Sequence, residues 1–144
     1  MVRTSEVRLR AEQARGRHAL ALRMSPKWCD VRADVLGRRV VVRVNRDAYP
    51  FRGPDTVSVD GCAYRRFLTS SLLKAAFGRC LCCESLLCGA VWSPSKGIDD
   101  VLDEVALTLV RLQGARDAIW GRSVARQRLP PGLDAEIPLY LCPR

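Results

Sequence analysis

Residues 39–54 read RVVVRVNRDAYPFRGP and join a strand pattern to a rigid connector. Over residues 39–45, valines alternate with polar residues, which predicts a half-buried strand of an antiparallel sheet. Residues 49–54 cannot continue this strand, because their two prolines lack backbone donors and favour extended geometry in the residues before them. The stretch therefore predicts a sheet strand that leads into a stiff, extended connector.

The segments on either side of this stretch predict a helix and further strands. On the N-terminal side, residues 4–15 have the spacing of a short helix that Gly16 ends, and residues 28–34 predict a strand. On the C-terminal side, residues 56–59 predict a short strand, and residues 64–77 allow one or two helical turns. These patterns indicate an α+β domain built around an antiparallel meander sheet.

The clearest helix pattern begins within the sequence WSPSKGIDDVL, residues 92–102. Apolar residues recur at helical spacing over residues 98–112, and we expect Ser93 or Ser95 to cap this helix and Gly114 to end it. Residues 115–127 predict one further short helix. The expected fold is a single domain over 1–144 with an N-terminal helix, a meander sheet and a central helix. Its parts are a basic helical region 4–23, a core 28–112 and a short C-terminal segment 113–144.

The net charge of +9 is concentrated near the N-terminus. Residues 1–48 hold 12 basic and 5 acidic residues, which leaves +7 in this third of the chain. A nucleic-acid footprint needs basic side chains gathered on one surface to contact phosphates. Because the excess belongs to the first helix and its surroundings, we expect it to contact a protein partner rather than nucleic acid.

The sequence predicts a protein of the cytoplasm, the nucleus or both. No run approaches the ~20 apolar residues that span a bilayer, and arginines interrupt residues 1–23, where a signal peptide needs an apolar centre. We therefore expect no membrane partner. In a reducing compartment the seven cysteines are thiols, metal ligands or a nucleophile rather than disulfides.

The order of these features resembles that of the ubiquitin-conjugating enzymes. The connector stands where this family has its Tyr-Pro-Phe-x-Pro-Pro signature, and Tyr49, Pro50 and Pro54 are shared with it. Trp92 begins a segment that matches the family's Trp-Ser-Pro-x-x-x-Ile-x-x-Val-Leu pattern at every specified position. Cys80, followed by a leucine, lies upstream of that segment, as the family's catalytic cysteine does.

The resemblance covers residues 28–112 and implies the family's fold and activity. Cys80 would accept ubiquitin or a ubiquitin-like protein from an activating enzyme as a thioester, and would pass it to a lysine or to a ubiquitin ligase. Arg79 is expected to favour the thiolate form of Cys80. The same loop holds two alternative nucleophiles, Cys82 and Cys83. The resemblance implies no cofactor, and it places Phe51, Pro94 and Ser95 in loops that contact ligases.

The chain departs from the family at the group that would stabilise the oxyanion of the reaction. The family places a His-Pro-Asn tripeptide before the nucleophile, but the only histidine and asparagine here are His18 and Asn45, far upstream. At the corresponding distance from the cysteine lie Ser70 and Ser71, whose hydroxyls are candidate donors.

Two other functions stay open on the same residues. A catalytically inactive variant would act as an adaptor that binds ubiquitin or a partner, which accounts for the missing tripeptide and the short C-terminal segment. A zinc-binding basic protein that contacts nucleic acid would instead use the clustered cysteines Cys80, Cys82, Cys83, Cys88 and Cys62. The spacing lacks paired Cys-x2-Cys units, so we expect no metal. Core positions are expected for Cys29, Cys62 and Cys142.

Overall fold

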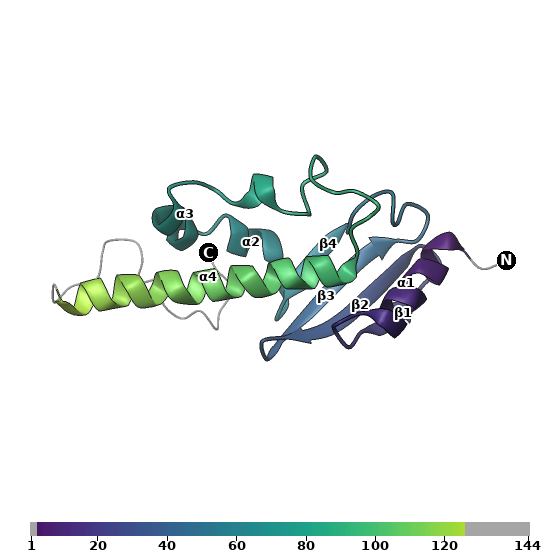
Figure 1. The fold of residues 1–144 in the computed structure, drawn as a ribbon, viewed down its shortest axis with the longest axis horizontal. Coiled ribbons are helices and arrows are strands. Elements are labelled where there is room, and N and C mark those ends of the chain that lie inside the picture. The colour runs from purple at the N-terminus through teal and green to yellow at the C-terminus, as the bar shows by residue number, and fades with distance from the viewer. Residues whose placement is uncertain (1–2, 126–144) are drawn as a thin grey trace.

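The computed structural model describes residues 3–125 and has an α+β architecture (Figure 1). Helix α1 (Thr4–Arg15) precedes the sheet, and the long helix α4 (Ile98–Ala125) ends the described part of the chain. The sheet strands are β1 (Ala21–Met24), β2 (Trp28–Val35), β3 (Arg38–Asn45), β4 (Thr56–Val59) and β5 (Cys62–Ala63). Short helices α2 (Tyr64–Leu68) and α3 (Ser71–Phe77) follow, and then the 3-10 turn η1 (Cys82–Glu84).

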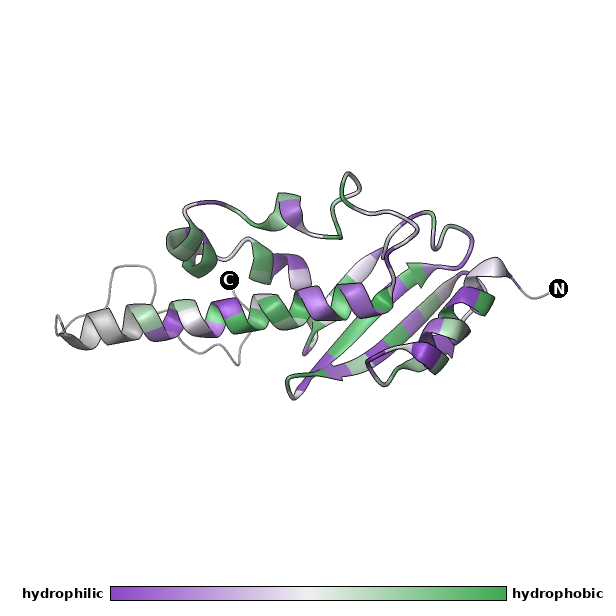
Figure 2. Cartoon of the chain, in the orientation of Figure 1, coloured by the Kyte–Doolittle hydropathy of each residue, from purple (hydrophilic) through white to green (hydrophobic). Residues whose placement is uncertain are grey.

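The five strands form one antiparallel meander in chain order, β1-β2-β3-β4-β5. In the central strand β3, Val40, Val42 and Val44 are fully buried and the residues between them are more exposed. Figure 2 shows this alternation as bands of hydrophobic and hydrophilic colour along the strands. The predicted strands 28–34, 39–45 and 56–59 are therefore confirmed, while β1 and β5 were not predicted.

Helix α4 contributes one wall of the core. Its inward face carries Ile98, Val101, Leu102 and Val105, all fully buried, and the helix contacts α2, α3 and β2. The predicted helix 98–112 is confirmed in position and in its buried face. Within residues 3–125, no helix combines the length and the apolar character that crossing a membrane would require.

The predicted end of this helix was wrong. Helix α4 passes through Gly114 and continues to Ala125, so it absorbs the described part of the second helix expected over 115–127. A glycine inside a helix costs about 1 kcal/mol relative to alanine. Burial of Leu112 and Ala115 on either side outweighs that cost, because both pack into the core. The short C-terminal segment 113–144 is thus largely helical where it is described, and Cys142 lies outside the described residues.

The start of α4 also differs from the prediction. Neither Ser93 nor Ser95 caps it, because their hydroxyls lie 2.7 Å apart and contact each other instead. The Gly97 N–H donates to Asp100 Oδ2 at 2.8 Å, and the Ile98 N–H donates to Glu12 Oε2 at 3.3 Å. The Glu12 carboxylate of α1 therefore provides part of the capping that was expected from Ser93 or Ser95.

Helix α1 ends at Gly16, as predicted, so the basic region 4–23 is a helix followed by strand β1 rather than one long helix. Much of the local positive charge is paired within the molecule. Arg8 contacts Glu12 at 2.6 Å, Arg46 contacts Glu6 at 2.8 Å, and Arg17 pairs with Asp103 of α4. The N-terminal charge therefore joins α1 to the sheet and to α4.

Candidate functional site: the cysteine loop

The candidate site is the cysteine loop, residues 80–88, between α3 and α4. Helix α3 ends at Gly78, whose φ of +71° lets the chain leave the helix in a left-handed turn. Leu81 then turns the chain with helical dihedral angles (φ −92°, ψ 0°) and buries its side chain, with only 4% of its surface exposed. This buried turn places Cys80 and Cys82 on the same side of the loop.

The Cys80 and Cys82 sulfurs are in direct contact. Their Sγ atoms lie 2.8 Å apart, and the Cys82 backbone N–H donates to Cys80 Sγ at 3.4 Å. Cys83 lies next to the pair, with its Sγ 3.9 Å from Cys82 Sγ. Cys80 Sγ is also 4.0 Å from the carbonyl oxygen of Leu68. The three candidate nucleophiles thus form one cluster, which we call the sulfur cluster (Cys80, Cys82 and Cys83).

The contacts within the sulfur cluster divide its thiols into two kinds. Hydrogen bonds from the Cys82 thiol and the Cys82 N–H lower the pKa of Cys80, and the positive charges of Lys74 and Arg65 lower it further. The same contact raises the pKa of Cys82 to about 11, because a thiol that donates a hydrogen bond to Cys80 keeps its proton; burial and the sulfurs of Cys83 and Cys80 raise it further. Of the pair, Cys80 is therefore the thiol that ionises more readily.

The positive charges that lower the pKa of Cys80 belong to other residues than the predicted Arg79. Arg79, the neighbour in sequence, is exposed and pairs with Glu84 at 2.6 Å. The cations that favour the Cys80 thiolate are Lys74 on α3 and Arg65 on α2. The prediction of an electropositive neighbour was right in kind, but it named the wrong residue because adjacency in sequence does not fix where a long side chain points.

A glutamate that the sequence did not single out holds the cysteine loop against α4. Glu104 accepts hydrogen bonds from the Ser85 hydroxyl and from the Leu86 N–H, each at 2.7 Å. It also accepts one from the Tyr64 hydroxyl at 2.8 Å, and that hydroxyl contacts Thr108 at 2.7 Å. One feature of the sequence could have indicated this role of Glu104. It is a carboxylate among the apolar residues of an amphipathic helix, and burying an unpaired charge there would be costly.

The two serines predicted as oxyanion donors occupy different environments. Ser70 caps helix α3, since its Oγ accepts the Leu73 N–H at 3.2 Å, and only 2% of the residue is exposed. Ser71 is the first residue of α3 and is exposed. Of the two, Ser71 is the one whose surface a substrate carbonyl can reach.

The connector 49–54 is fastened to the segment before α4. The Trp92 indole N–H donates to the Pro50 carbonyl at 2.8 Å, and the Trp92 and Tyr49 rings lie 6.1 Å apart. Gly53 packs so closely on the indole that an added Cβ would lie 2.9 Å from Cδ2. The Tyr49 hydroxyl donates to both carboxylate oxygens of Glu12, at 2.7 and 2.9 Å. The motif residues therefore form one contact set, with Pro54 buried beside them.

The residues that the resemblance assigned to ligase contact are all accessible. Phe51 is 77% exposed, although it is a large aromatic side chain. Pro94 and Ser95 are exposed as well, and they follow Trp92, which contacts the connector that carries Phe51. The three residues therefore lie on neighbouring, accessible segments.

An open groove of about 480 Å³ lies beside the cysteine loop. Its lining includes Val57 of β4 and Ala63 of the short edge strand β5, together with Cys82 and Cys83. Arg65 of α2, one of the cations near Cys80, also lines it. The groove has room for an extended peptide next to the sulfur cluster.

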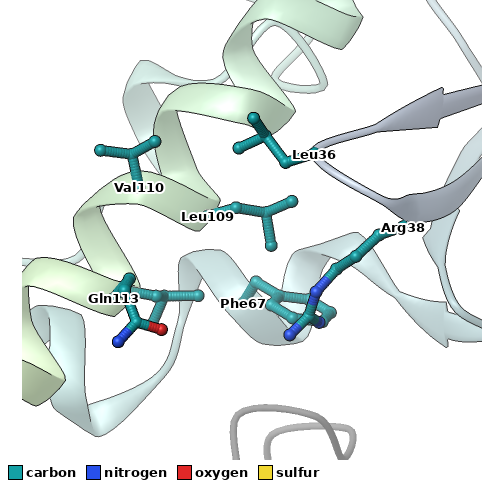
Figure 3. A pocket seen from close by; sticks show the side chains of 7 residues that line it. Leu36, Arg38, Phe67, Leu109, Val110 and Gln113 are labelled. Atoms are coloured by element: carbon teal, nitrogen blue, oxygen red, sulfur yellow. The ribbon is translucent and has the colours of Figure 1, made fainter.

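A second pocket, of about 290 Å³, lies between the turn after β2, helix α2 and helix α4 (Figure 3). Its lining is mostly apolar, with Phe67 and Leu109 beside the exposed Leu36 (64%) and Val110 (58%). Its described lining residues include none of those that line the groove beside the cysteine loop. The described structure thus has an accessible apolar surface apart from the sulfur cluster.

Zinc was the alternative role considered for the clustered cysteines. Over residues 3–125, no group of three or more His, Cys, Asp or Glu side chains is arranged to hold a metal ion. Of the cysteines expected in the core, Cys29 is buried and Cys62 is only half-buried.

No protein family model, no curated protein and no solved structure matches this chain.

Proposed function

We propose that this protein is a ubiquitin-conjugating-enzyme-like transferase that carries ubiquitin, or a ubiquitin-like protein, on Cys80. The observation that carries the proposal is the Cys80 thiol, which is half-exposed on a loop and has its pKa lowered by its partner Cys82 and by two cations. A thiolate in an accessible, electropositive environment is what nucleophilic transfer of an acyl group requires.

The proposed reaction has two steps. The Cys80 thiolate attacks the carbonyl of the thioester that joins the modifier to its activating enzyme, and the thiolate of the activating enzyme leaves. A lysine amine then attacks the new thioester, which forms an amide, and Cys80 leaves again as a thiolate. The lowered pKa of Cys80 favours both steps, since it increases the fraction of thiolate at a given pH and makes the thiolate a better leaving group.

The arrangement around the cysteine supports the same proposal. A helix, an antiparallel meander that holds the Tyr-Pro connector between β3 and β4, a cysteine loop and a long helix follow each other along the chain. The groove beside the sulfur cluster has room for the extended end of a modifier. The exposed side chains Phe51, Pro94 and Ser95 are available to a ligase, and the outer face of α1 to the activating enzyme.

The direct test is formation of a covalent adduct. The full chain is incubated with activating enzyme, ubiquitin and ATP, and the products are separated with and without reductant. We expect an adduct one ubiquitin larger that reductant removes, that Cys80→Ala abolishes and that Cys83→Ala retains. An adduct that survives in Cys80→Ala, or no adduct with ubiquitin or with any ubiquitin-like modifier and its activating enzyme, would overturn the proposal.

A second candidate is the inactive adaptor, and the environment of Ser70 favours it. That serine is buried and serves as a helix cap, so one of the two predicted oxyanion donors is not accessible to a substrate. Losing one preorganised donor typically lowers the rate about 10²–10³-fold. The adaptor predicts that the full chain binds ubiquitin without an adduct, and that Cys80→Ala binds it equally well.

A further inference from the structure

The contact between two thiols of unlike character suggests a second chemistry for the sulfur cluster. We propose that Cys80 and Cys82 form a peroxide-reactive pair, in which Cys80 is the oxidised residue and Cys82 the resolving thiol that closes a disulfide with it. The oxidation step rests on the geometry of the loop alone. Its consequence for ubiquitin transfer rests on the proposed function.

The geometry meets the requirements of such a pair. A redox-sensitive cysteine is an accessible thiolate with a second thiol poised beside it. Cys80 is half-exposed, and its Sγ already lies 2.8 Å from Cys82 Sγ. The turn at Leu81 holds the two residues together, because its side chain is buried in the core while the sulfurs on either side remain accessible. Closure therefore needs little movement of the backbone.

The proposed chemistry is balanced with hydrogen peroxide as the oxidant. The Cys80 thiolate attacks one peroxide oxygen, the O–O bond breaks, and a sulfenic acid and hydroxide result. The Cys82 thiol then attacks the sulfenic sulfur, the S–O bond breaks, and water leaves as the S–S bond forms. Two thiols are oxidised to one disulfide, and one peroxide is reduced to two waters.

The division of roles follows from the same contacts. The thiolate is the form that reacts with peroxide, and hydrogen bonds from Cys82 together with Lys74 and Arg65 favour that form at Cys80. Cys83 is a competitor for the resolving role, but its sulfur contacts Cys82 at 3.9 Å rather than Cys80. The first disulfide is therefore expected between Cys80 and Cys82.

A disulfide at this position would remove the proposed nucleophile. Oxidised Cys80 has no thiolate with which to attack a thioester, so adduct formation would stop until a reductant restored it. Peroxide would then control the step at which the modifier is loaded, and no change elsewhere in the fold would be needed.

The experiment uses the reduced full chain, hydrogen peroxide as the probe, and mass spectrometry without any ubiquitin present. Residual thiols are alkylated after the peroxide is removed, and trypsin releases residues 80–96, which contain four cysteines. We expect this peptide to lose 2 Da and to take up two alkyl groups instead of four. A thiol reductant applied before alkylation should restore four.

Three variants assign the roles. Cys82→Ser should leave a sulfenic acid on Cys80 that dimedone traps, and Cys80→Ser should lose 2 Da at least about tenfold more slowly than the natural chain. Cys88→Ser is the matched control from the other end of the loop and should bridge at the natural rate. Retention of fast bridging in Cys82→Ser would overturn the proposal, as would a natural chain that peroxide leaves unbridged.

The two proposals fail separately. Bridging by peroxide in a chain that never forms a ubiquitin adduct would refute the transferase and leave the thiol pair standing. If the ubiquitin adduct forms at the same rate before and after bridging, the proposed control of ubiquitin loading by oxidation of Cys80 is refuted, because a disulfide-bonded sulfur cannot be the nucleophile. An adduct in a chain that peroxide does not bridge would refute the thiol pair and keep the transferase.

Discussion

Replacement of Glu12 by alanine should destabilise the fold far more than its position on a surface helix indicates. The carboxylate is only 15% exposed and accepts hydrogen bonds from Arg8, from the Tyr49 hydroxyl and from the Ile98 N–H at the start of α4. Glu12 therefore joins three segments that are distant in sequence: the first helix, the connector and the long helix.

The expected loss follows from two contributions. A buried hydroxyl that loses its acceptor costs about 1–3 kcal/mol, and Tyr49 is almost completely buried. Loss of a negative group at the N-terminus of α4 adds about 0.3–1 kcal/mol. Glu12→Ala should thus lower the free energy of unfolding by about 3 kcal/mol, out of the 5–15 kcal/mol typical of a domain. Glu12→Gln, which keeps an acceptor, should cost about 1 kcal/mol.

Urea unfolding, followed by far-ultraviolet circular dichroism, measures these differences. Glu84→Ala is the matched control, because that carboxylate is exposed and its ion pair is with exposed Arg79. It should change stability by less than about 0.5 kcal/mol. In the double variant with Tyr49→Phe, the cost of Glu12→Ala should shrink, since no buried hydroxyl is left unpaired. A cost for Glu12→Ala as small as the control's, or simple additivity in the double variant, would refute the reasoning.

Three further predictions concern other contacts. Gly53→Ala should lower the free energy of unfolding by about 1–3 kcal/mol in the same assay, because the new methyl group meets the Trp92 indole ring packed against it. Gly89→Ala is the control and should be neutral, because the space around Gly89 is open. Equal costs for the two variants would argue against that packing. Burial and a neighbouring carboxylate raise the pKa of Tyr64 well above its usual range, so the unfolded chain releases this proton above about pH 10 while the folded chain keeps it. This group should therefore not affect the free energy of unfolding below pH 10, and the free energy of unfolding should fall as the pH rises above 10. Tyr64→Phe should weaken that fall. If Tyr64→Phe loses as much stability at alkaline pH as the natural chain, Tyr64 is not its cause. Because the pKa of Cys80 is lowered by its hydrogen-bonded partner, the pH profile of its alkylation by iodoacetamide should have a midpoint below that of an ordinary thiol. Cys82→Ala, which removes the side-chain donor, should move the midpoint upward.

The secondary structure was predictable wherever a pattern is local. Strand β4 over residues 56–59 and the end of α1 at Gly16 agree with the sequence because alternation and a glycine stop act over a few residues. The end of α4 was not predictable in this way. Whether a helix passes through Gly114 depends on what its flanking side chains bury, and that is decided by α2 and α3. Strand β1 was missed because its four residues form an edge that is only partly buried.

In the candidate site, too, local features were predictable from the sequence and contacts between distant segments were not. Cys80 could be singled out from the motifs on either side of it, but its partner and its cations could not. The roles of Glu12 and Glu104 depend on contacts between segments 18 to 86 residues apart, which no local pattern records. What the sequence does carry is the residue type. Both are carboxylates that a helix turns inward, and each requires a partner from another element.

The hydrogen bonds from Ser85 and Leu86 to Glu104 divide the long segment between α3 and α4 into two parts with different tolerance for change. The sulfur cluster lies before these bonds and is held by the buried turn at Leu81. The exposed residues 89–91 lie after them, in a turn where the Val91 and Trp92 N–H groups donate to the Cys88 carbonyl oxygen. Since doubling the length of a flexible loop costs only about 0.6 kcal/mol, extra residues inserted at 89–91 should leave the cysteine geometry intact. Residues 89–91 are thus a place where a tag or fluorophore could be inserted beside the groove, which Gly89 lines, while the sulfur cluster keeps its arrangement.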